Sequence, residues 1–135
     1  ETFPKLVRAG TLYAMPSSSY WLDTGTPEQF IRANLDVLAG RRLREALVPL
    51  ADVHSAAQVV DSVIGADSKI GALSVIERSV LFQNCEIHEE TAIIDSVLSD
   101  SVYVGAGARV ERCVIGRGQR VEVDEHLIDV KRPEA

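Results

Sequence analysis

Aliphatic residues return at a fixed interval along residues 53–130. The interval is 17 residues, and it divides into steps of six, six and five. Every position that opens a step is aliphatic, and these leading residues are Ile64, Ile70, Ile76, Leu81, Ile87, Ile93, Leu98, Val104, Val110, Ile115, Val121 and Leu127. A unit this short cannot bury its own apolar face, so stacked units must share one core. The pattern predicts a mainly β domain, a β-helix with three short sides in every 17-residue coil.

Other positions of the coil are typical of turns. The fourth place of the first and second sides holds mainly Asp, Asn, Ser and Gly, which accept a left-handed backbone; Leu73 and Glu90 depart from this preference. The full set is Asp67, Asn84, Ser101 and Gly118 on the first side, and Leu73, Glu90, Gly107 and Asp124 on the second. The next place on the first side is mostly small (Ser68, Cys85, Val102, Gln119), as expected where the chain turns towards a narrow interior. We also expect the recurring valines Val63, Val80, Val97 and Val114 to fill that interior, because β-branched residues suit stacked strands.

One polar column supports the same register. It consists of Asp61, Arg78, Asp95, Arg112 and Asp129, which are 17 residues apart and alternate in sign. Stacked coils lie about 4.8 Å apart, so each charge should lie between two opposite ones. Exposed pairs contribute on the order of 0 to 1 kcal/mol each, so this charge ladder should align the coils more than it drives folding.

Composition and charge narrow the class of protein. The chain has 135 residues, of which 46% are hydrophobic, and this is enough for a sizeable core. Its net charge of -6, without a long basic run, argues against nucleic acid or an anionic membrane surface as a partner. No apolar stretch approaches the roughly 20 residues that span a bilayer, and no signal peptide opens the chain. These features predict a cytoplasmic protein.

The two cysteines, Cys85 and Cys113, fall in different columns of the repeat. They should therefore not meet. The chain has neither a CxxC motif nor a Cys/His cluster, so small buried thiols are expected in preference to a zinc site or a disulfide.

The chain before the repeats has another character. Residues 1–23 resemble strand pieces and loops, with aromatic residues (Phe3, Tyr13, Tyr20, Trp21) that call for further sequence upstream. A helix should follow, because Thr26 can cap it, Pro27 fits its first position, Gln29 completes a capping box and Gly40 suits its end. Ile31, Leu35 and Leu38 share one face of that helix. Residues 41–44 are expected to be a solvated linker rather than a phosphate site, and residues 47–57 an imperfect first coil.

A family resemblance rests on residues 20–30, with the sequence YWLDTGTPEQF, together with FPKL at residues 3–6 and the coils behind them. This combination resembles the end of the catalytic domain of sugar-1-phosphate nucleotidyltransferases, and it is most similar to the mannose-1-phosphate guanylyltransferases. The resemblance implies a left-handed β-helix preceded by a helix and a remnant of an α/β nucleotidyltransferase domain. On this basis residues 1–46 are the end of the catalytic domain with a linker helix, and residues 47–135 are the hexapeptide-repeat β-helix.

The resemblance also implies a reaction. A nucleoside triphosphate and a sugar-1-phosphate give a nucleotide sugar, GDP-mannose in the most similar group, and pyrophosphate, with Mg²⁺ bridging the phosphates. A glucose-1-phosphate nucleotidyltransferase is the alternative within the family. Asp23 matches the second of two metal-binding aspartates, while the first aspartate and the glycine-rich nucleotide loop belong to an N-terminal catalytic segment that this sequence lacks. No catalytic residue is therefore assigned, and the 135 residues alone are expected to be inactive. Without the resemblance, Asp23 would be a carboxylate near a positive helix start.

Two other classes of function stay open. Hexapeptide β-helices also resemble acyltransferases, in which a catalytic histidine lines a cleft; here His88 should point outwards, and His54 and His126 should be solvated in the end coils. The third class is a structural module that forms a homo-oligomer through the β-helix or regulates the enzyme. Its outward Phe82 and Tyr103 and its open strand edges favour self-association, most simply with two-fold symmetry.

Overall fold

The structure is a computed structural model, and it describes residues 2–41 and 51–133. Within these ranges it contains the helices α1 (Thr2–Arg8) and α2 (Pro27–Leu38), followed by short strands. The strands are β1 (Asp52–Val53), β2 (Gln58–Val60), β3 (Val63–Ile64), β4 (Lys69–Ile70), β5 (Val75–Glu77), β6 (Val80–Leu81), β7 (Glu86–Ile87), β8 (Ala92–Ile94), β9 (Val97–Leu98), β10 (Tyr103–Val104), β11 (Arg109–Glu111), β12 (Val114–Ile115), β13 (Arg120–Val121), β14 (His126–Ile128) and β15 (Lys131–Arg132).

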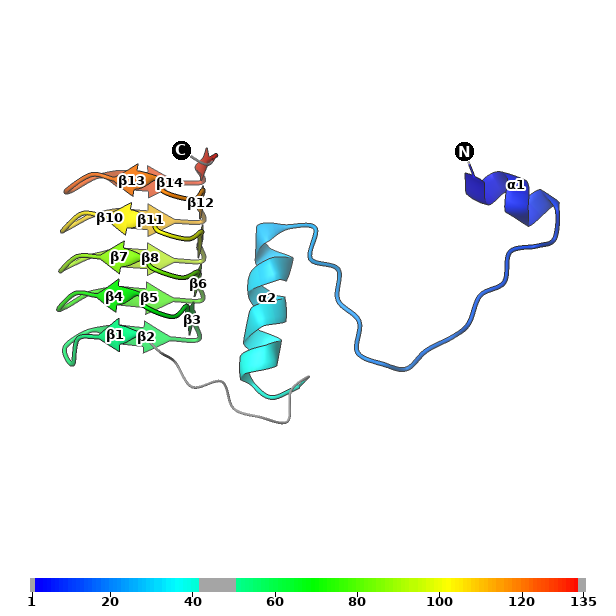
Figure 1. Cartoon of the computed structure of the whole chain (residues 1–135), viewed down its shortest axis with the longest axis horizontal. Coiled ribbons are helices and arrows are strands. Elements are labelled where there is room, and N and C mark those ends of the chain that lie inside the picture. The colour runs from blue at the N-terminus through cyan, green and yellow to red at the C-terminus, as the bar shows by residue number, and fades with distance from the viewer. Residues whose placement is uncertain (1, 42–50, 134–135) are drawn as a thin grey trace.

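Consecutive strands belong to different sheets, as a β-helix requires. Sheet A has the order β1-β4-β7-β10-β13, sheet B β14-β11-β8-β5-β2, and sheet C β15-β12-β9-β6-β3. All pairs are parallel and join residues 17 apart, as in Val80 with Val97. Each set of three consecutive strands forms one coil, so coil one holds β1–β3 and coil five holds β13–β15, as the stacked layers of Figure 1 show. The 17-residue register is confirmed.

The leading residues form the core of the β-helix. Ile76, Ile93, Leu98, Val104, Val110, Ile115 and Val121 are completely buried, and Ile64 in coil one is the half-buried exception. Residues 63–121 contain no helix, and each strand there begins one residue before a leading residue, close to the predicted start.

The turn positions are also confirmed. Asp67, Asn84, Ser101 and Gly118 have φ values of 60°, 57°, 59° and 69°. Leu73 and Glu90 adopt the same left-handed backbone, with φ of 59° and 58°, although their side chains do not favour it. The fold therefore imposes this backbone wherever the coil must turn, and the residue type follows only in part.

The recurring valines are a correction to the sequence analysis. Val80 and Val97 are buried together with Ile31 of α2, and Val63 packs against this cluster. Val114 lines the cleft between the coils and the loop before α2, so all four valines lie on the outer face of the β-helix and not in its interior. The reason is the alternation of side chains along a strand. Because the neighbouring Leu81 and Leu98 point inwards, the preceding valines must point outwards, where α2 covers them.

A column of buried hydroxyl groups stabilises one corner of the coils, and the sequence analysis missed it. Ser79 donates its hydroxyl to the Glu77 carbonyl (2.7 Å) and accepts the Ser96 N–H (3.1 Å). The same arrangement recurs at Ser62, Ser96 and, with a thiol, at Cys113. Buried backbone N–H groups thus gain partners where the strands stop.

The chain before the coils differs from expectation at its start. Residues 2–8 form α1, although strand pieces and loops were expected; Pro4 fits the first turn of a helix, and no described strand pairs with this segment. Helix α1 has no buried residue, and it lies far from the coils at the end of an extended segment (Figure 1). No helix among the described residues is long and apolar enough to cross a membrane.

Helix α2 follows the prediction closely. Thr26 is its N-cap, Pro27 opens it, and Gly40 takes a φ of 75° just beyond its end. Its buried Asp36 receives hydrogen bonds from the Tyr20 hydroxyl and from Arg41 Nη1 (2.6 Å). These contacts join the segment before the helix to Arg41, three residues beyond its end. The remaining linker residues, the start of the expected first coil at residues 47–50, and the proposed domain boundary at 46/47 lie outside the described residues.

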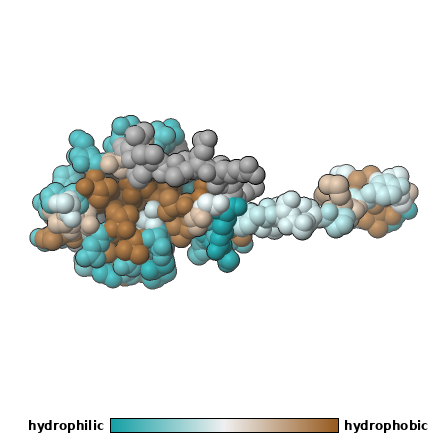
Figure 2. Space-filling model, turned by 90° about the horizontal axis from the view of Figure 1, so that it is seen from below, coloured by the Kyte–Doolittle hydropathy of each residue, from teal (hydrophilic) through white to brown (hydrophobic). Residues whose placement is uncertain are grey.

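Coil one has an apolar open end. Val53, Val59 and Val60 are exposed there. Val53 and Val59, together with Leu38 of α2, Val63 and Ile64, line a cleft of about 570 Å³. Figure 2, which views the molecule from below, shows apolar residues gathered on this face. The last coil of a β-helix has the same unpaired strand edges, so both ends are exposed to pairing.

Candidate functional site

Asp23 lies on the loop that enters α2. Its Oδ1 accepts the Gly25 N–H at 3.1 Å, and the Thr26 hydroxyl accepts the Gln29 N–H at 3.3 Å. Glu28 lies in the first turn, where hydrogen bonds from its own backbone N–H and from Thr26 lower its pKa. The loop is thus a short, capped turn on which Asp23 is exposed.

The donor set around Asp23 is incomplete for a metal site within the described part of the chain. No group of three or more His, Cys, Asp or Glu residues there could hold a metal ion. Magnesium usually keeps several waters and takes one or two carboxylates plus substrate phosphates. Asp23 therefore fits one ligand of such a site, and the others would have to come from phosphate, water and protein groups outside these residues.

Aromatic and aliphatic contacts fix the start of α2 on sheet C. The rings of Phe30 and Phe82 stack with centroids 6.0 Å apart and an angle of 8° between their planes. Ile31, one residue further, is 7% exposed and buried against Val80 and Val97. The outward position of Phe82 was predicted, but its partner on α2 was not. Figure 1 shows α2 running beside sheet C, with the Asp23 loop at one end of the helix.

A cleft of about 280 Å³ separates this loop from the coils. One wall is formed by Thr24, Gly25 and Thr26, and the other by Phe82, Val97, Ser99 and Val114. The β-helix therefore supplies half of the surroundings of the Asp23 loop, and the side chain of Asp23 is not itself part of this cleft.

The charge ladder lies on the other flank of α2. Arg78 Nε is 2.7 Å from Asp95 Oδ1, and Arg112 Nε is 2.7 Å from Asp129 Oδ1. The column thus alternates in sign as predicted, and its close ion pairs form between Arg78 and Asp95 and between Arg112 and Asp129. The Arg112 guanidinium lowers the pKa of Asp129. Ile31 and Leu35 of α2 line a cleft of about 280 Å³ with this ladder.

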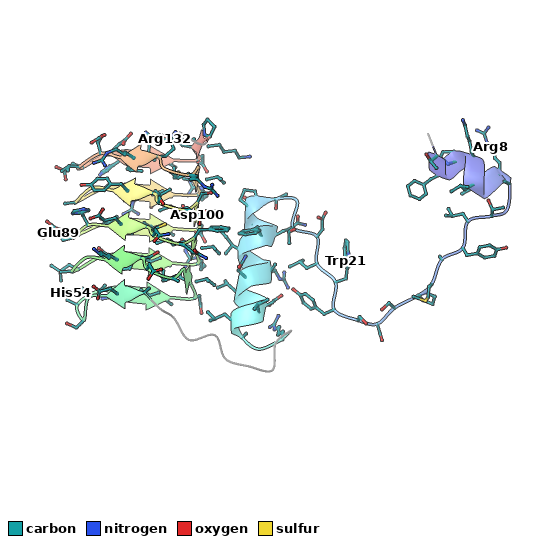
Figure 3. All side chains as sticks on the ribbon, viewed as in Figure 1. Arg8, Trp21, His54, Glu89, Asp100 and Arg132 are labelled. Carbon is teal, nitrogen blue, oxygen red and sulfur yellow. The ribbon has the colours of Figure 1, made fainter. Side chains whose placement is uncertain are left out.

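His88 points outwards from sheet A, as predicted. Its ring centroid is 4.8 Å from that of Tyr103, and its Nε2 is 3.6 Å from Glu86 Oε1. Nε2 is buried and makes no hydrogen bond to a described residue. His88 borders a cleft of about 240 Å³ that lies over Gly71, and His54 and Lys69 also line this cleft. His54 and Glu89 are labelled near this cleft in Figure 3. His54 and His126 are exposed, as expected.

The cysteines have structural roles. Cys85 and Cys113 are both buried free thiols, which confirms that they form no disulfide with each other. Burial raises the pKa of the Cys85 thiol to about 11, so almost none of it is the reactive thiolate near neutral pH. Neither thiol is a candidate nucleophile.

Comparisons with known proteins agree with this architecture. A family model described as "GlmU-like, C-terminal hexapeptide" matches residues 45–130. A mannose-1-phosphate guanylyltransferase from Mycobacterium tuberculosis is 37% identical over 94 residues, covering 61% of this chain and 26% of the relative. A glucose-1-phosphate adenylyltransferase from Desulfitobacterium hafniense is 30% identical over 114 residues, covering 64% of this chain and 29% of the relative.

The chain thus spans between a quarter and a third of the length of these curated relatives. Among solved structures, a GDP-perosamine N-acetyl transferase from Caulobacter crescentus has 18% identity and a TM-score of 0.28, covering 76% of this chain and 63% of that chain. The parallel coils and the family match confirm the expected left-handed β-helix of hexapeptide repeats. The chain belongs to the GlmU-like C-terminal hexapeptide family.

Proposed function

We propose that this chain is the C-terminal part of a sugar-1-phosphate nucleotidyltransferase, in which the β-helix holds α2 and the Asp23 loop in place. The observation that carries the proposal is the docking of α2 on sheet C through Phe30, Phe82 and Ile31. The names of the two curated relatives support the reaction class. GDP-mannose is the product we favour, because the guanylyltransferase relative is 37% identical and the adenylyltransferase relative is 30% identical.

Asp23 would hold Mg²⁺ in this proposal. The ion would neutralise and orient the oxygens of the triphosphate, which is the chemistry that phosphoryl transfer needs most. The chain's own residues position the carboxylate: the Gly25 N–H holds Oδ1, and the Thr26 cap fixes the loop against the first turn of α2. The Phe30–Phe82 stack then fixes that turn on the coils.

One carboxylate is not sufficient for the reaction. Nucleotidyl transfer requires two substrates held in reacting geometry, and this depends on several positioned groups. We therefore infer that the 135-residue chain is inactive by itself, that its partner is the N-terminal catalytic segment of the same enzyme, and that its role there is structural or regulatory.

The test is pyrophosphate release from GTP and mannose-1-phosphate over a magnesium series, in the full-length enzyme that carries this segment. Asp23→Asn removes the charge and keeps the size, so we expect turnover to fall by two orders of magnitude or more, with folding unchanged. Asp67→Asn is the matched control, because Asp67 is an exposed turn residue with φ 60° that asparagine also accepts. Equal rates for the wild type and Asp23→Asn would remove Asp23 from the site. Activity of the isolated chain would disprove a supporting role, and a faster reaction with ATP and glucose-1-phosphate would replace GDP-mannose as the product.

Acyl transfer is the second candidate, and one observation favours it. His88 Nε2 is buried, makes no hydrogen bond to a described residue, and borders the cleft over Gly71. A histidine in this state could accept a proton from a substrate amine. Calorimetric titration with acetyl coenzyme A checks it: binding that is lost in His88→Asn would favour acyl transfer, and the absence of binding would exclude it.

A further inference from the structure

Sheet A presents charged side chains that form no ion pair within the described part of the chain. Asp52, Lys69, Arg120 and Glu122 are exposed and form no ion pair with any residue of 2–41 or 51–133. By contrast, the arginines at the corners of the coils, such as Arg78, Arg112 and Arg117, all pair with carboxylates of neighbouring coils. Helix α2 covers sheet C and leaves sheet A open (Figure 1). The charges of sheet A are therefore available to a partner.

The order of these charges from coil one to coil five makes sheet A complementary to sheet A of a second copy whose coil order is reversed. From coil one to coil five, the first outward column reads Asp52, Lys69, Glu86, Tyr103, Arg120, and the second reads His54, Gly71, His88, Gly105, Glu122. A two-fold axis along the central strand β7 (Glu86–Ile87) places coil one of one copy over coil five of the other. Asp52 then faces Arg120 of the second copy, and His54 faces Glu122.

The shape of the surface agrees with the same inversion. The cleft of about 240 Å³ over Gly71 lies on coil two, between His54 and His88. The bulky ring of Tyr103 lies on coil four, where the Arg120 guanidinium is 3.7 Å from its centroid. Inverting the coil order brings Tyr103 of one copy to coil two of the other, beside Lys69 and the cleft. In a parallel dimer, Tyr103 would instead face coil four, where Gly105 lies.

From this complementarity of charge and shape, we propose that sheet A is a docking surface for a second copy of this chain, arranged antiparallel about a two-fold axis through coil three. The inference specifies the face and register of the structural role proposed above, and it does not depend on the nucleotidyl transfer. Five strands about 4.8 Å apart span only about 19 Å, so the contact is smaller than the roughly 800 Å² per partner of a standard interface. The dimer of this chain is therefore weak, and Glu86 opposes it because it meets its own copy at the axis.

Sedimentation equilibrium of the 135-residue chain, from about 10 to 500 μM, tests the proposal. Asp52→Arg replaces two symmetric attractions with two repulsions and should raise the dissociation constant about tenfold, and Arg120→Asp should do the same. Combining the two substitutions should restore dimerisation. Glu86→Gln should strengthen it. Gln58→Arg, on sheet B of the same coil, is the matched control and should have little effect, and circular dichroism should show all variants folded.

Each outcome decides the question. A wild-type chain that stays monomeric over this range, or a dimer that Asp52→Arg does not weaken, would disprove docking through sheet A. A double variant as weak as the single ones would disprove the antiparallel register, because a parallel dimer places Asp52 opposite His54 and Arg120 opposite Glu122 and gains nothing from the exchange. Loss of nucleotidyl transfer in the full-length enzyme would not affect these results, so this proposal and the proposed function can fail separately.

Discussion

The coils at residues 51–133 and the chain at residues 2–41 are held in place by different means. In the coils, every strand is hydrogen-bonded to strands 17 residues away, and each leading residue packs between its equivalents in neighbouring coils. The chain at residues 2–41 has one amphipathic helix that touches the coils through a few side chains, and the preceding residues are largely exposed. The coils are therefore held together by contacts among themselves, while most apolar groups before α2, such as Trp21 at 82% exposure, remain in solvent.

This difference predicts the effect of a charge placed in the coils, which is the largest effect expected. Leu98 is completely buried at the centre of the stack, so Leu98→Asp buries an unpaired carboxylate and should cost about 3 to 5 kcal/mol of unfolding free energy. Urea denaturation followed by circular dichroism measures it. Ser101→Asp is the control, because Ser101 is exposed at a left-handed turn that aspartate accepts, and it should be nearly neutral. A similar cost for both substitutions would contradict the assignment of inward and outward positions.

A smaller effect is expected at the hydroxyl column. Ser79→Ala removes the acceptor of the buried Ser96 N–H, and an unpaired buried donor costs about 1 to 3 kcal/mol. Ser79→Cys should cost less, because Cys113 already fills the equivalent place two coils later, where its Sγ accepts the Val130 N–H at 3.4 Å. Equal stability of the alanine variant and the wild type in urea titrations would show that the column has no energetic role.

The smallest effect concerns the charge ladder and depends on pH. Arg112 lowers the pKa of Asp129 in the folded chain, so the stabilisation is present above the unfolded pKa of about 3.9 and is lost as the pH falls through the lower folded value. Asp129→Asn should therefore be slightly less stable than the wild type at pH 7, and the two should converge below about pH 3. High salt should also reduce the difference, because both partners are exposed. A difference that grew on acidification would contradict this sign.

The sequence predicted the repeating coils better than the contacts of the chain that precedes them. The leading residues, the left-handed turns and the 17-residue register were predictable because each signal repeats from coil to coil, and the repetition outweighs misfits such as Leu73. The prediction that the side chains of Val80 and Val97 point into the β-helix was wrong, because the sequence of two adjacent aliphatic residues does not reveal which one faces inwards. The cap of α2 was predicted from local residues alone, whereas the contacts of Phe30 with Phe82 and of Tyr20 with Asp36 join distant residues that no spacing rule connects.

The candidate site shows this limit most clearly. The position of Asp23 beside a helix start could be predicted from its neighbours, but its relation to the coils depends on how α2 docks. The hydroxyl column was missed for a similar reason: Ser62, Ser79 and Ser96 are small polar residues, and only the bend of the coil shows that they turn inwards to backbone partners.

The central claim is that the coils form a rigid platform that holds α2 and, through it, the Asp23 loop. Hydrogen–deuterium exchange of the 135-residue chain, read by mass spectrometry, tests this most directly. We predict strong protection in β4 to β12, intermediate protection in α2, and none at residues 11–22; Ile31→Asp should remove the protection of α2 and leave that of the coils unchanged. An α2 that exchanged in the wild type as fast as residues 11–22, or coils that lost protection together with α2 in Ile31→Asp, would contradict the claim.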